Sequence, residues 1–200
     1  MKINDSEAYR LLKKYGISIA DFALAKDLEE ARLSAGNIGY PLYLKIDSPV
    51  IIHKKNLGCV LKVRDEGKID NAFRLVINNA KKMTKNINGV IVQKSVDGFE
   101  SIAGVKCDGQ FGHVIMFGSG GPMTEFLNDT SFRLVPISEI DARSMIADTK
   151  AGKYANGSVI DALLKLSKLI EENNEIKELD INPLMIGESA IAADVRVIVG

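Results

Sequence analysis

The chain has 200 residues, of which 46% are hydrophobic and 26% charged, a composition typical of a globular protein that buries a core. Basic and acidic side chains number 26 each, so the formal net charge is zero, which argues against general nucleic-acid binding. No apolar run is long enough to cross a bilayer, and the first residues show no signal-peptide pattern. We therefore expect a cytoplasmic protein with neither a nucleic-acid nor a membrane partner.

The first half of the chain predicts three helices and three strands. The first helix follows the cap candidates Asn4, Asp5 and Ser6 and ends at Gly16, and the second follows the cap residue Asp27. The apolar patterns then predict strands at 41–46 and 58–63, a helix within 65–83 and a buried strand at 89–96.

The second half predicts strands at 101–107 and 113–117, joined by a turn, and a glycine-rich segment that follows directly. Two helices are expected at 138–147 and 159–172, and two closing strands at 176–186 and 190–199. A break in composition near Asp97 and Gly98 predicts a hinge between Val92 and Glu100. The hinge separates a smaller N-terminal lobe from a larger C-terminal lobe.

Two features are candidates for binding phosphate. Lys45 ends an apolar strand, where its ammonium group can hold a phosphate as a point charge, although taken alone it is better explained as an edge-strand lysine that snorkels to water. Gly118, Gly120 and Gly121 follow a buried strand, and such glycines let successive N–H groups converge on an anion. An ordinary tight turn is the alternative, and the segment matches neither a Walker loop nor a dinucleotide fingerprint.

The closing strands carry candidates for a metal site. Glu178, Asp180 and Asn182 alternate along one strand and therefore share a face, and a hairpin partner can bring Asp194 beside them. Two or three oxygen ligands together with nucleotide phosphates are a common way to hold Mg²⁺. A solvated polar face of an edge hairpin is the alternative.

Glu100 and His53 each have a functional and a structural interpretation, whereas the other histidine has only a structural one. Glu100 lies beside the hinge, where it can accept hydrogen bonds from ribose hydroxyls or simply face solvent. His53 lies beside Lys54 and Lys55; it is either a loop histidine bonded to the backbone or a nucleophile for a phosphoryl group, with the lysines supplying positive charge. The other histidine, His113, lies within a strand and is expected to be structural.

The two cysteines, Cys59 and Cys107, do not have the spacing of metal ligands. We expect both to be buried free thiols that pack as small apolar side chains.

Several separate motifs, in order along the chain, resemble one known family. They are GYPLYLKIDSPVIIHKKNLGCV, GFESIAGVKCDGQFGHVIMFGSGG, RLVPIS and ELDINPL. They look like the ATP-grasp beta subunit of NDP-forming acyl-CoA synthetases, and most of all like the ADP-forming acetyl-CoA synthetases (acetate–CoA ligases) of archaea. The resemblance runs from Glu7 to Val199. It implies an α+β, ATP-grasp fold with two lobes of mixed β-sheets and helices, 1–92 and 93–200.

The same resemblance implies a reaction and a partner. Acyl-CoA, ADP and phosphate would be converted reversibly to acid, ATP and CoA, with phosphate carried on histidine and Mg²⁺ and ATP/ADP as cofactors. This chain would be the nucleotide half of a heteromer with a CoA-binding alpha subunit, in an α2β2 assembly.

Residue roles also follow from the resemblance. His53 would be a phosphate carrier, Asn182 and Asp194 the magnesium ligands, and Glu100 the ribose acceptor. The remaining nucleotide contacts would be Lys45, Gln93, Lys94, Ser95, Val96, Gly118, Gly120 and Gly121. Glu125, Asp129 and Arg133 lie in a matching segment without assigned roles.

The chain departs from the family at two places. The family loop usually reads His-Lys-Ser-Asp-Val-Gly-Gly, whereas this chain has Asn56 in place of the acid and Cys59 in place of the last glycine. The segment 150–159 is also short and lacks an arginine that the family often carries. These changes bear on the loop conformation and the acyl substrate more than on the nucleotide site. The alternatives are a succinyl-CoA-type ligase, a carboxylate–amine ligase and a non-catalytic nucleotide-sensing module of an acyltransferase complex.

Overall fold

The computed structural model describes residues 1–121 and 129–200, whose contacts divide the chain into two units. Unit 1 contains Met1 and residues 8–19 and 96–200, and unit 2 contains residues 2–7 and 20–95. The division after Ser95 lies close to the predicted boundary between residues 92 and 93. Residues 8–19, which the predicted lobes placed in the N-terminal part, instead pack with the C-terminal residues.

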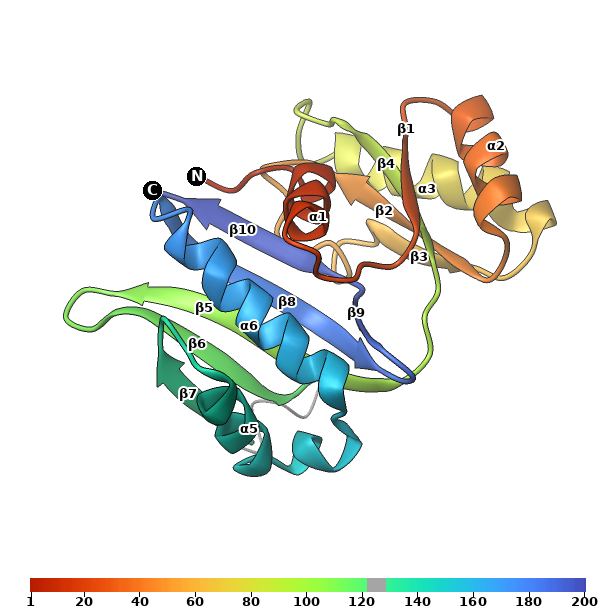
Figure 1. Ribbon diagram of the computed structural model, residues 1–200. Helices are drawn as coiled ribbons and strands as arrows, with labels where there is room; N and C mark the ends of the chain where they lie inside the picture. Colours follow the sequence, from red (N-terminus) through yellow and green to blue (C-terminus); the bar gives the residue numbers. More distant parts are fainter. Residues whose placement is uncertain (122–128) are drawn as a thin grey trace. The chain divides into compact units, whose positions relative to one another are not determined.

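Unit 2 is built on a four-stranded antiparallel sheet with the order β1-β4-β2-β3. Its strands are β1 (Phe22–Ala25), β2 (Leu42–Asp47), β3 (Val60–Val63) and β4 (Gly89–Lys94). Helices α2 (Leu28–Ile38) and α3 (Ile69–Lys81) pack on this sheet, and a short 3₁₀ helix, η1 (Glu66–Lys68), precedes α3. Figure 1 shows both helices beside the sheet.

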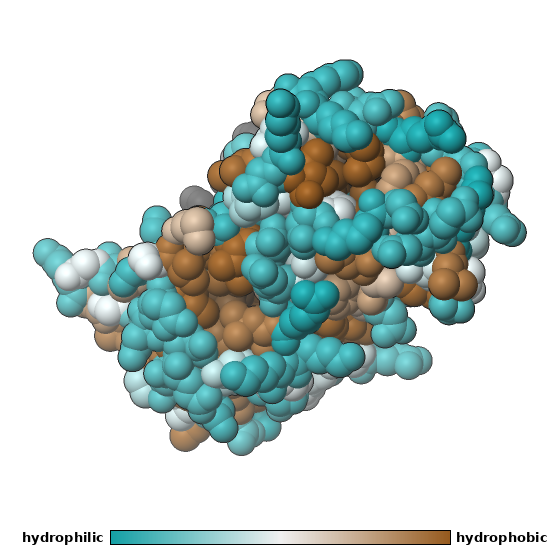
Figure 2. Space-filling model, turned by 90° about the horizontal axis from the view of Figure 1, so that it is seen from above, coloured by the Kyte–Doolittle hydropathy of each residue, from teal (hydrophilic) through white to brown (hydrophobic). Residues whose placement is uncertain are grey.

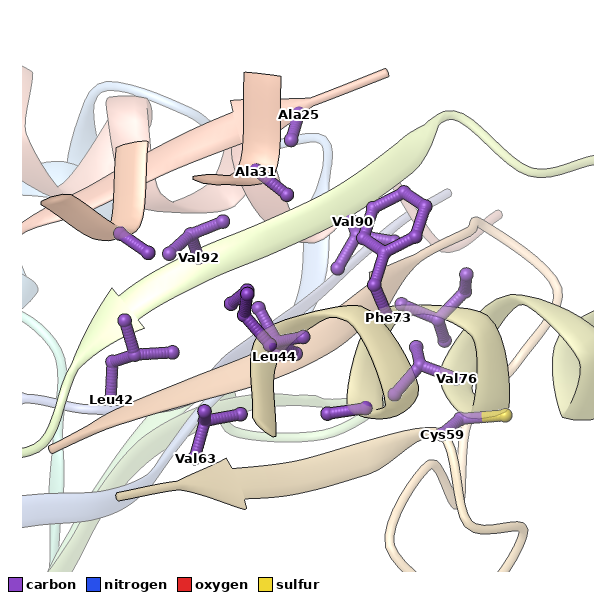
Figure 3. Packing of buried hydrophobic residues seen from close by; sticks show 14 of the residues in the cluster. Ala25, Ala31, Leu42, Leu44, Cys59, Val63, Phe73, Val76, Val90 and Val92 are labelled. Atoms are coloured by element: carbon purple, nitrogen blue, oxygen red, sulfur yellow. The ribbon is translucent and has the colours of Figure 1, made fainter. Parts of the chain in front are cut away.

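The core of unit 2 forms because apolar side chains recur at helical and strand spacing. Helix α2 begins where the Asp27 side chain accepts a hydrogen bond from the Glu30 N–H at 2.9 Å. In Figure 3, Phe73 and Val76 of α3 lie against sheet side chains such as Leu44 and Val90. Burial of these apolar side chains stabilises the unit by about 1.5–3 kcal/mol for each large one.

Unit 1 contains a larger antiparallel sheet with the order β10-β8-β5-β6-β7, and β9 pairs with β8. Its strands are β5 (Phe99–Asp108), β6 (Gly112–Ser119), β7 (Thr130–Leu134), β8 (Ile176–Ile186), β9 (Ala190–Ala192) and β10 (Val195–Val199). Helices α5 (Glu139–Ala147) and α6 (Gly157–Glu171) and the 3₁₀ helix η2 (Lys150–Tyr154) complete the C-terminal part. Helix α6 contacts β5 and β9, and its inner face is buried.

Helix α1 (Asp5–Lys14) is shared between the units. Its first three residues belong to unit 2, and the remainder belongs to unit 1. Tyr9 and Leu12 on the unit 1 portion are fully buried, and the Tyr9 hydroxyl bonds to Ala193 O, which accounts for the packing of this portion with the C-terminal residues.

The α+β class is confirmed, and the predicted helices and strands lie close to the observed ones. Strands β1 and β7 were not predicted, and the expected strand 190–199 is split into β9 and β10 at Ala193 and Asp194. No helix in the described part of the chain is long and apolar enough to cross a membrane. Polar side chains cover most of the face shown in Figure 2, with apolar side chains visible between them.

Candidate functional site

The predicted metal ligands of unit 1 lie side by side. The Asn182 N–H donates to the Asp194 carbonyl oxygen at 3.1 Å, so the closing hairpin does bring the two residues together. The buried Tyr9 hydroxyl donates to Ala193 O at 2.9 Å and to Asp194 Oδ1 at 3.2 Å. Tyr9 therefore orients the Asp194 carboxylate from helix α1, a role that the sequence did not reveal.

Further charged side chains continue along the same face of β8. Arg196 forms ion pairs with Glu178 and, at 3.8 Å, with Asp180. Burial raises the pKa of the Asp180 carboxyl, Arg196 opposes the rise, and the charges of Glu178 and Asp194 add to it. Acidic groups thus gather where a bound cation would relieve their repulsion, although no cluster of three His, Cys, Asp or Glu side chains within residues 1–121 and 129–200 is arranged to hold a metal alone.

A cavity of about 430 Å³ opens beside these charges on the large sheet. Gly104 pairs with both Met116 and Asp180 on neighbouring strands, and an added Cβ there would lie 2.9 Å from Leu179 O, so glycine lets the backbones of β5 and β8 approach closely. The lining combines apolar side chains with charged ones: Val105, Val114, Met116, Phe132, Leu179, Lys106, Asp108, Glu178, Asp180 and Arg196. Such a mixed lining is common in small-molecule sites.

The glycine-rich segment has a structural explanation at two positions. An added Cβ at Gly118 would lie 2.1 Å from Asp129 O, and one at Gly120 would lie 2.8 Å from Ser101 O. The Gly120 N–H donates to Glu100 O at 2.9 Å, so this group bonds within the protein. The exposed Glu100 carboxylate lies beside Gly121, since an added Cβ there would lie 3.1 Å from Glu100 Oε2.

Asp129 and Arg133, which had no predicted roles, bind neighbouring elements. The Asp129 carboxylate accepts hydrogen bonds from Lys150 N at 2.6 Å, from Ala151 N at 3.2 Å and from the Ser119 hydroxyl. Burial alone would raise the Asp129 pKa, but these donors outweigh it and lower the pKa. Arg133 donates to Asp148 at 2.9 Å, which ties β7 to α5; Glu125 lies outside the described residues.

The predicted hinge residues end β4 in unit 2. Gln93 is buried on β4, and its Nε2 has no hydrogen-bond partner among the described residues. Lys94 Nζ donates to Tyr40 O at 3.4 Å, and Ser95 N donates to Pro41 O at 3.1 Å. Val96, the first residue of this stretch in unit 1, is half-buried.

Lys45 also belongs to unit 2, where it lies on β2 between β3 and β4. Only 6% of the residue is exposed, and its ammonium lies 6.0 Å from the centre of the Tyr43 ring. Lys45 is therefore not an edge-strand lysine, because β2 has a neighbour on each side.

The loop between β2 and β3 directs neighbouring residues in opposite directions. His53 is exposed, whereas only 6% of Lys54 is exposed and it pairs with Asp5. This corrects the expectation that Lys54 supplies positive charge at the imidazole, because Asp5 already neutralises it. His113, by contrast, shares a hydrogen bond with Ile176 O at 2.8 Å, in agreement with a structural role.

The two cysteines differ in burial. Cys59 is fully buried in the core of unit 2, and burial raises the pKa of its thiol while Lys54 opposes the rise. Cys107 is only half-buried, which corrects the expectation for that residue. In the loop that departs from the family pattern, the residue with the positive φ, 63°, is Gly58. Cys59, which stands where the family has a second glycine, packs in the core instead.

Two antiparallel sheets with helices packed on them make this an α+β protein. A family model described as an ATP-grasp domain matches residues 1–199. The chain is 40% identical to the beta subunit of acetate–CoA ligase (ADP-forming) I of Pyrococcus furiosus, covering 97% of this chain and 90% of that subunit. The chain belongs to the ATP-grasp family of ADP-forming acetate–CoA ligase beta subunits.

Other relatives are similar to this chain over its whole length, but some of them are much longer proteins. Acetate–CoA ligase (ADP-forming) I of Archaeoglobus fulgidus is 38% identical, and the match covers this whole chain but 31% of that protein. A solved structure of acetyl-coenzyme A synthetase 1 from Ca. Korarchaeum cryptofilum, with coenzyme A and Ca-AMPCP, has a TM-score of 0.91 at 36% identity. That match covers 100% of this chain and 93% of the other. Another structure of that enzyme contains coenzyme A and Mg-AMPPCP, with a phosphohistidine segment pointing towards the nucleotide-binding site. Its TM-score is 0.83 at 34% identity, and the match covers 100% of this chain and 93% of the other.

Proposed function

We propose that this chain is the nucleotide-binding beta subunit of an ADP-forming acyl-CoA synthetase and transfers a phosphoryl group between histidine and ADP. The observation that carries the proposal is the nearly full-length match to a separate beta subunit. Such a subunit works with a CoA-binding alpha subunit, and we propose an α2β2 assembly. Its expected location is the cytoplasm, as the sequence predicted.

The oxygen donors of unit 1 fit a magnesium ion. Asn182 and Asp194 lie together, and the acidic neighbours Asp180 and Glu178 add negative charge. Two protein oxygens completed by nucleotide phosphates suit Mg²⁺. The ion would neutralise phosphate charge, while the chain would bind nucleotide through Lys45, Gln93, Lys94, Ser95, Val96, Glu100, Gly118, Gly120 and Gly121.

The exposed imidazole of His53 suits a phosphate carrier. In the direction of ATP synthesis, a terminal β-phosphate oxygen of ADP attacks the phosphorus of phosphohistidine. The phosphorus–nitrogen bond breaks, and its electron pair returns to that ring nitrogen; the other ring nitrogen carries a proton, so the ring leaves as neutral imidazole. Positioning and charge stabilisation supply most of the catalysis in such transfers.

Nucleotide binding is tested first, with the full chain. We expect heat on titration with ADP and MgCl₂, and about 2.7 kcal/mol of added stability when the nucleotide concentration reaches about 100 times its Kd. Chelating the magnesium should weaken binding. Neither heat nor a thermal shift would contradict the proposal.

The role of His53 is tested by substitution with alanine in a complex reconstituted with the proposed alpha subunit. We expect ATP formation from acetyl-CoA, ADP and phosphate to stop, while ADP binding persists, because only the acceptor nitrogen is lost. The matched control is His113→Ala, which removes the other histidine and should retain turnover. Full turnover by His53→Ala would remove the carrier role.

A further inference from the structure

A buried charge cluster lies behind the loop that carries His53, entirely within unit 2. Asp5 is 1% exposed, and its carboxylate accepts hydrogen bonds from Lys2 Nζ at 2.7 Å and from Lys54 Nζ. Lys2 Nζ also donates to Ser48 O at 2.8 Å. Lys54 is thus held at its charged end, one residue beyond His53.

The other end of the cluster is bound to the sheet. The Asp5 N–H donates to Asp47 Oδ1 at 2.8 Å, and the Ser6 hydroxyl donates to Asp47 Oδ2. Asn88 Nδ2 donates to Asp47 Oδ2 at 2.7 Å. Asp47 is fully buried at the end of β2, so the start of α1 is fixed to the strand from which the loop departs.

The backbone of Lys54 joins this side-chain anchor to the loop. Lys54 N donates to Ile52 O at 3.0 Å, and Cys59 N donates to Lys54 O at 2.8 Å. The first bond spans His53, and the second closes the segment 54–59 that follows it. The ion pair with Asp5 thus attaches the side chain of Lys54 at the residue whose backbone bonds begin and end next to the imidazole.

We propose that Asp5 is a positioning residue for phosphoryl transfer at His53, acting through Lys54. This inference rests on the proposed function, because it needs His53 as the acceptor. Asp5 itself is buried and does not touch the reacting atoms. An ion pair within the low-dielectric interior holds Lys54 in one direction, and accurate placement of a nucleophile strongly affects the rate of transfer.

The test measures transfer of label from γ-labelled ATP to His53 in a single turnover, with the full chain, Mg²⁺ and the alpha subunit. Asp5→Asn keeps the shape and the backbone N–H but removes the charge, and Lys54→Met keeps the length but removes the ammonium. We expect each to slow labelling on the order of 10²-fold without changing ATP affinity. The double variant should be no slower than the slower single variant, because both remove one interaction.

Two controls separate positioning from general stability. Asp5→Glu restores the charge and should recover part of the rate. Asp70→Asn breaks the exposed Arg32–Asp70 ion pair of the same unit, away from the loop, and should leave the rate unchanged. Hydrogen exchange should rise at Cys59 N–H in the Asp5→Asn and Lys54→Met proteins while α3 stays protected.

The outcomes are distinguishable. Absence of label on His53 in the unaltered protein would contradict the proposed function. Normal labelling by folded Asp5→Asn or Lys54→Met protein would overturn the positioning role alone. If Asp5→Asn does not fold, the Lys54→Met protein decides the matter, since it leaves the Lys2–Asp5 pair in place.

Discussion

At the scale of single residues, the Tyr9 hydroxyl has the clearest measurable role. Tyr9→Phe removes the bonds to Ala193 O and Asp194 Oδ1 but keeps the buried ring. We expect a loss of about 1–3 kcal/mol of stability and, for the magnesium site proposed at Asp194, a decrease in Mg²⁺ affinity of about 10- to 100-fold, because the hydroxyl would orient a metal ligand. Urea unfolding and calorimetry with Mg²⁺ and ADP measure the two effects.

The matched control is Tyr15→Phe. Tyr15 follows the same helix, and its hydroxyl accepts a bond from Asn173 Nδ2 at 2.8 Å, away from Asp194. Its loss should affect stability slightly and Mg²⁺ affinity not at all. An unchanged Mg²⁺ affinity in folded Tyr9→Phe protein would show that Asp194 does not depend on this hydroxyl.

Residue types were easier to predict from the sequence than the direction of each side chain. The hairpin that joins Asn182 and Asp194 was predicted because strand alternation fixes which residues share a face. The loop after β2 has no such periodicity, so the inward Lys54 and the outward His53 could not be told apart. The pairing of Lys54 with Asp5 also spans 49 positions of sequence, which no local pattern reveals.

At the scale of elements, close packing of the β6 and β7 backbones depends on Gly118. An alanine there would place its Cβ 2.1 Å from Asp129 O and 2.9 Å from Thr130 Cγ2. We expect Gly118→Ala to destabilise the protein by roughly 3 kcal/mol, because relief of the clash requires separating the strands. The midpoint of urea unfolding measures this loss.

Gly109 is the control for that substitution. It lies in the turn between β5 and β6, and an added Cβ there meets no atom within 4 Å. Gly109→Ala should change stability by less than about 1 kcal/mol. Equal stability of the two variants would mean that β7 can move away from β6 without cost.

The elements that the sequence failed to predict are short or lie at a sheet edge. Strand β1 has four residues, of which only Ala25 is buried, so no alternation marks it. Strand β7 is an edge strand in which Phe132 and Leu134 are each 53% exposed, contrary to the usual pattern of apolar burial. Long amphipathic helices such as α6 were predicted because their apolar spacing persists over several turns.

At the scale of the whole molecule, unit 1 is discontinuous in sequence. The fragment 96–200 lacks Tyr9 and Leu12, whose side chains are fully buried in that unit. Each large apolar side chain contributes about 1.5–3 kcal/mol, against a total stability of about 5–15 kcal/mol for a domain. We expect this fragment not to unfold cooperatively until a peptide of residues 1–19 is added, as measured by circular dichroism.

The peptide provides its own control. A version with Tyr9 and Leu12 replaced by serine should fail to restore the cooperative transition. A sharp transition in the fragment without any peptide would contradict the expectation and would show that helix α1 is dispensable for unit 1.

The sharing of helix α1 also constrains how this gene can recombine with its relatives. A single crossover between codons 95 and 96 would join residues 8–19 of one parent to residues 96–200 of the other, although both segments build one core. A chimera that keeps each core from one parent needs three crossovers (the seams), between residues 7 and 8, 19 and 20, and 95 and 96. Shuffling experiments should therefore recover functional hybrids at these three seams in combination and seldom at the last seam alone.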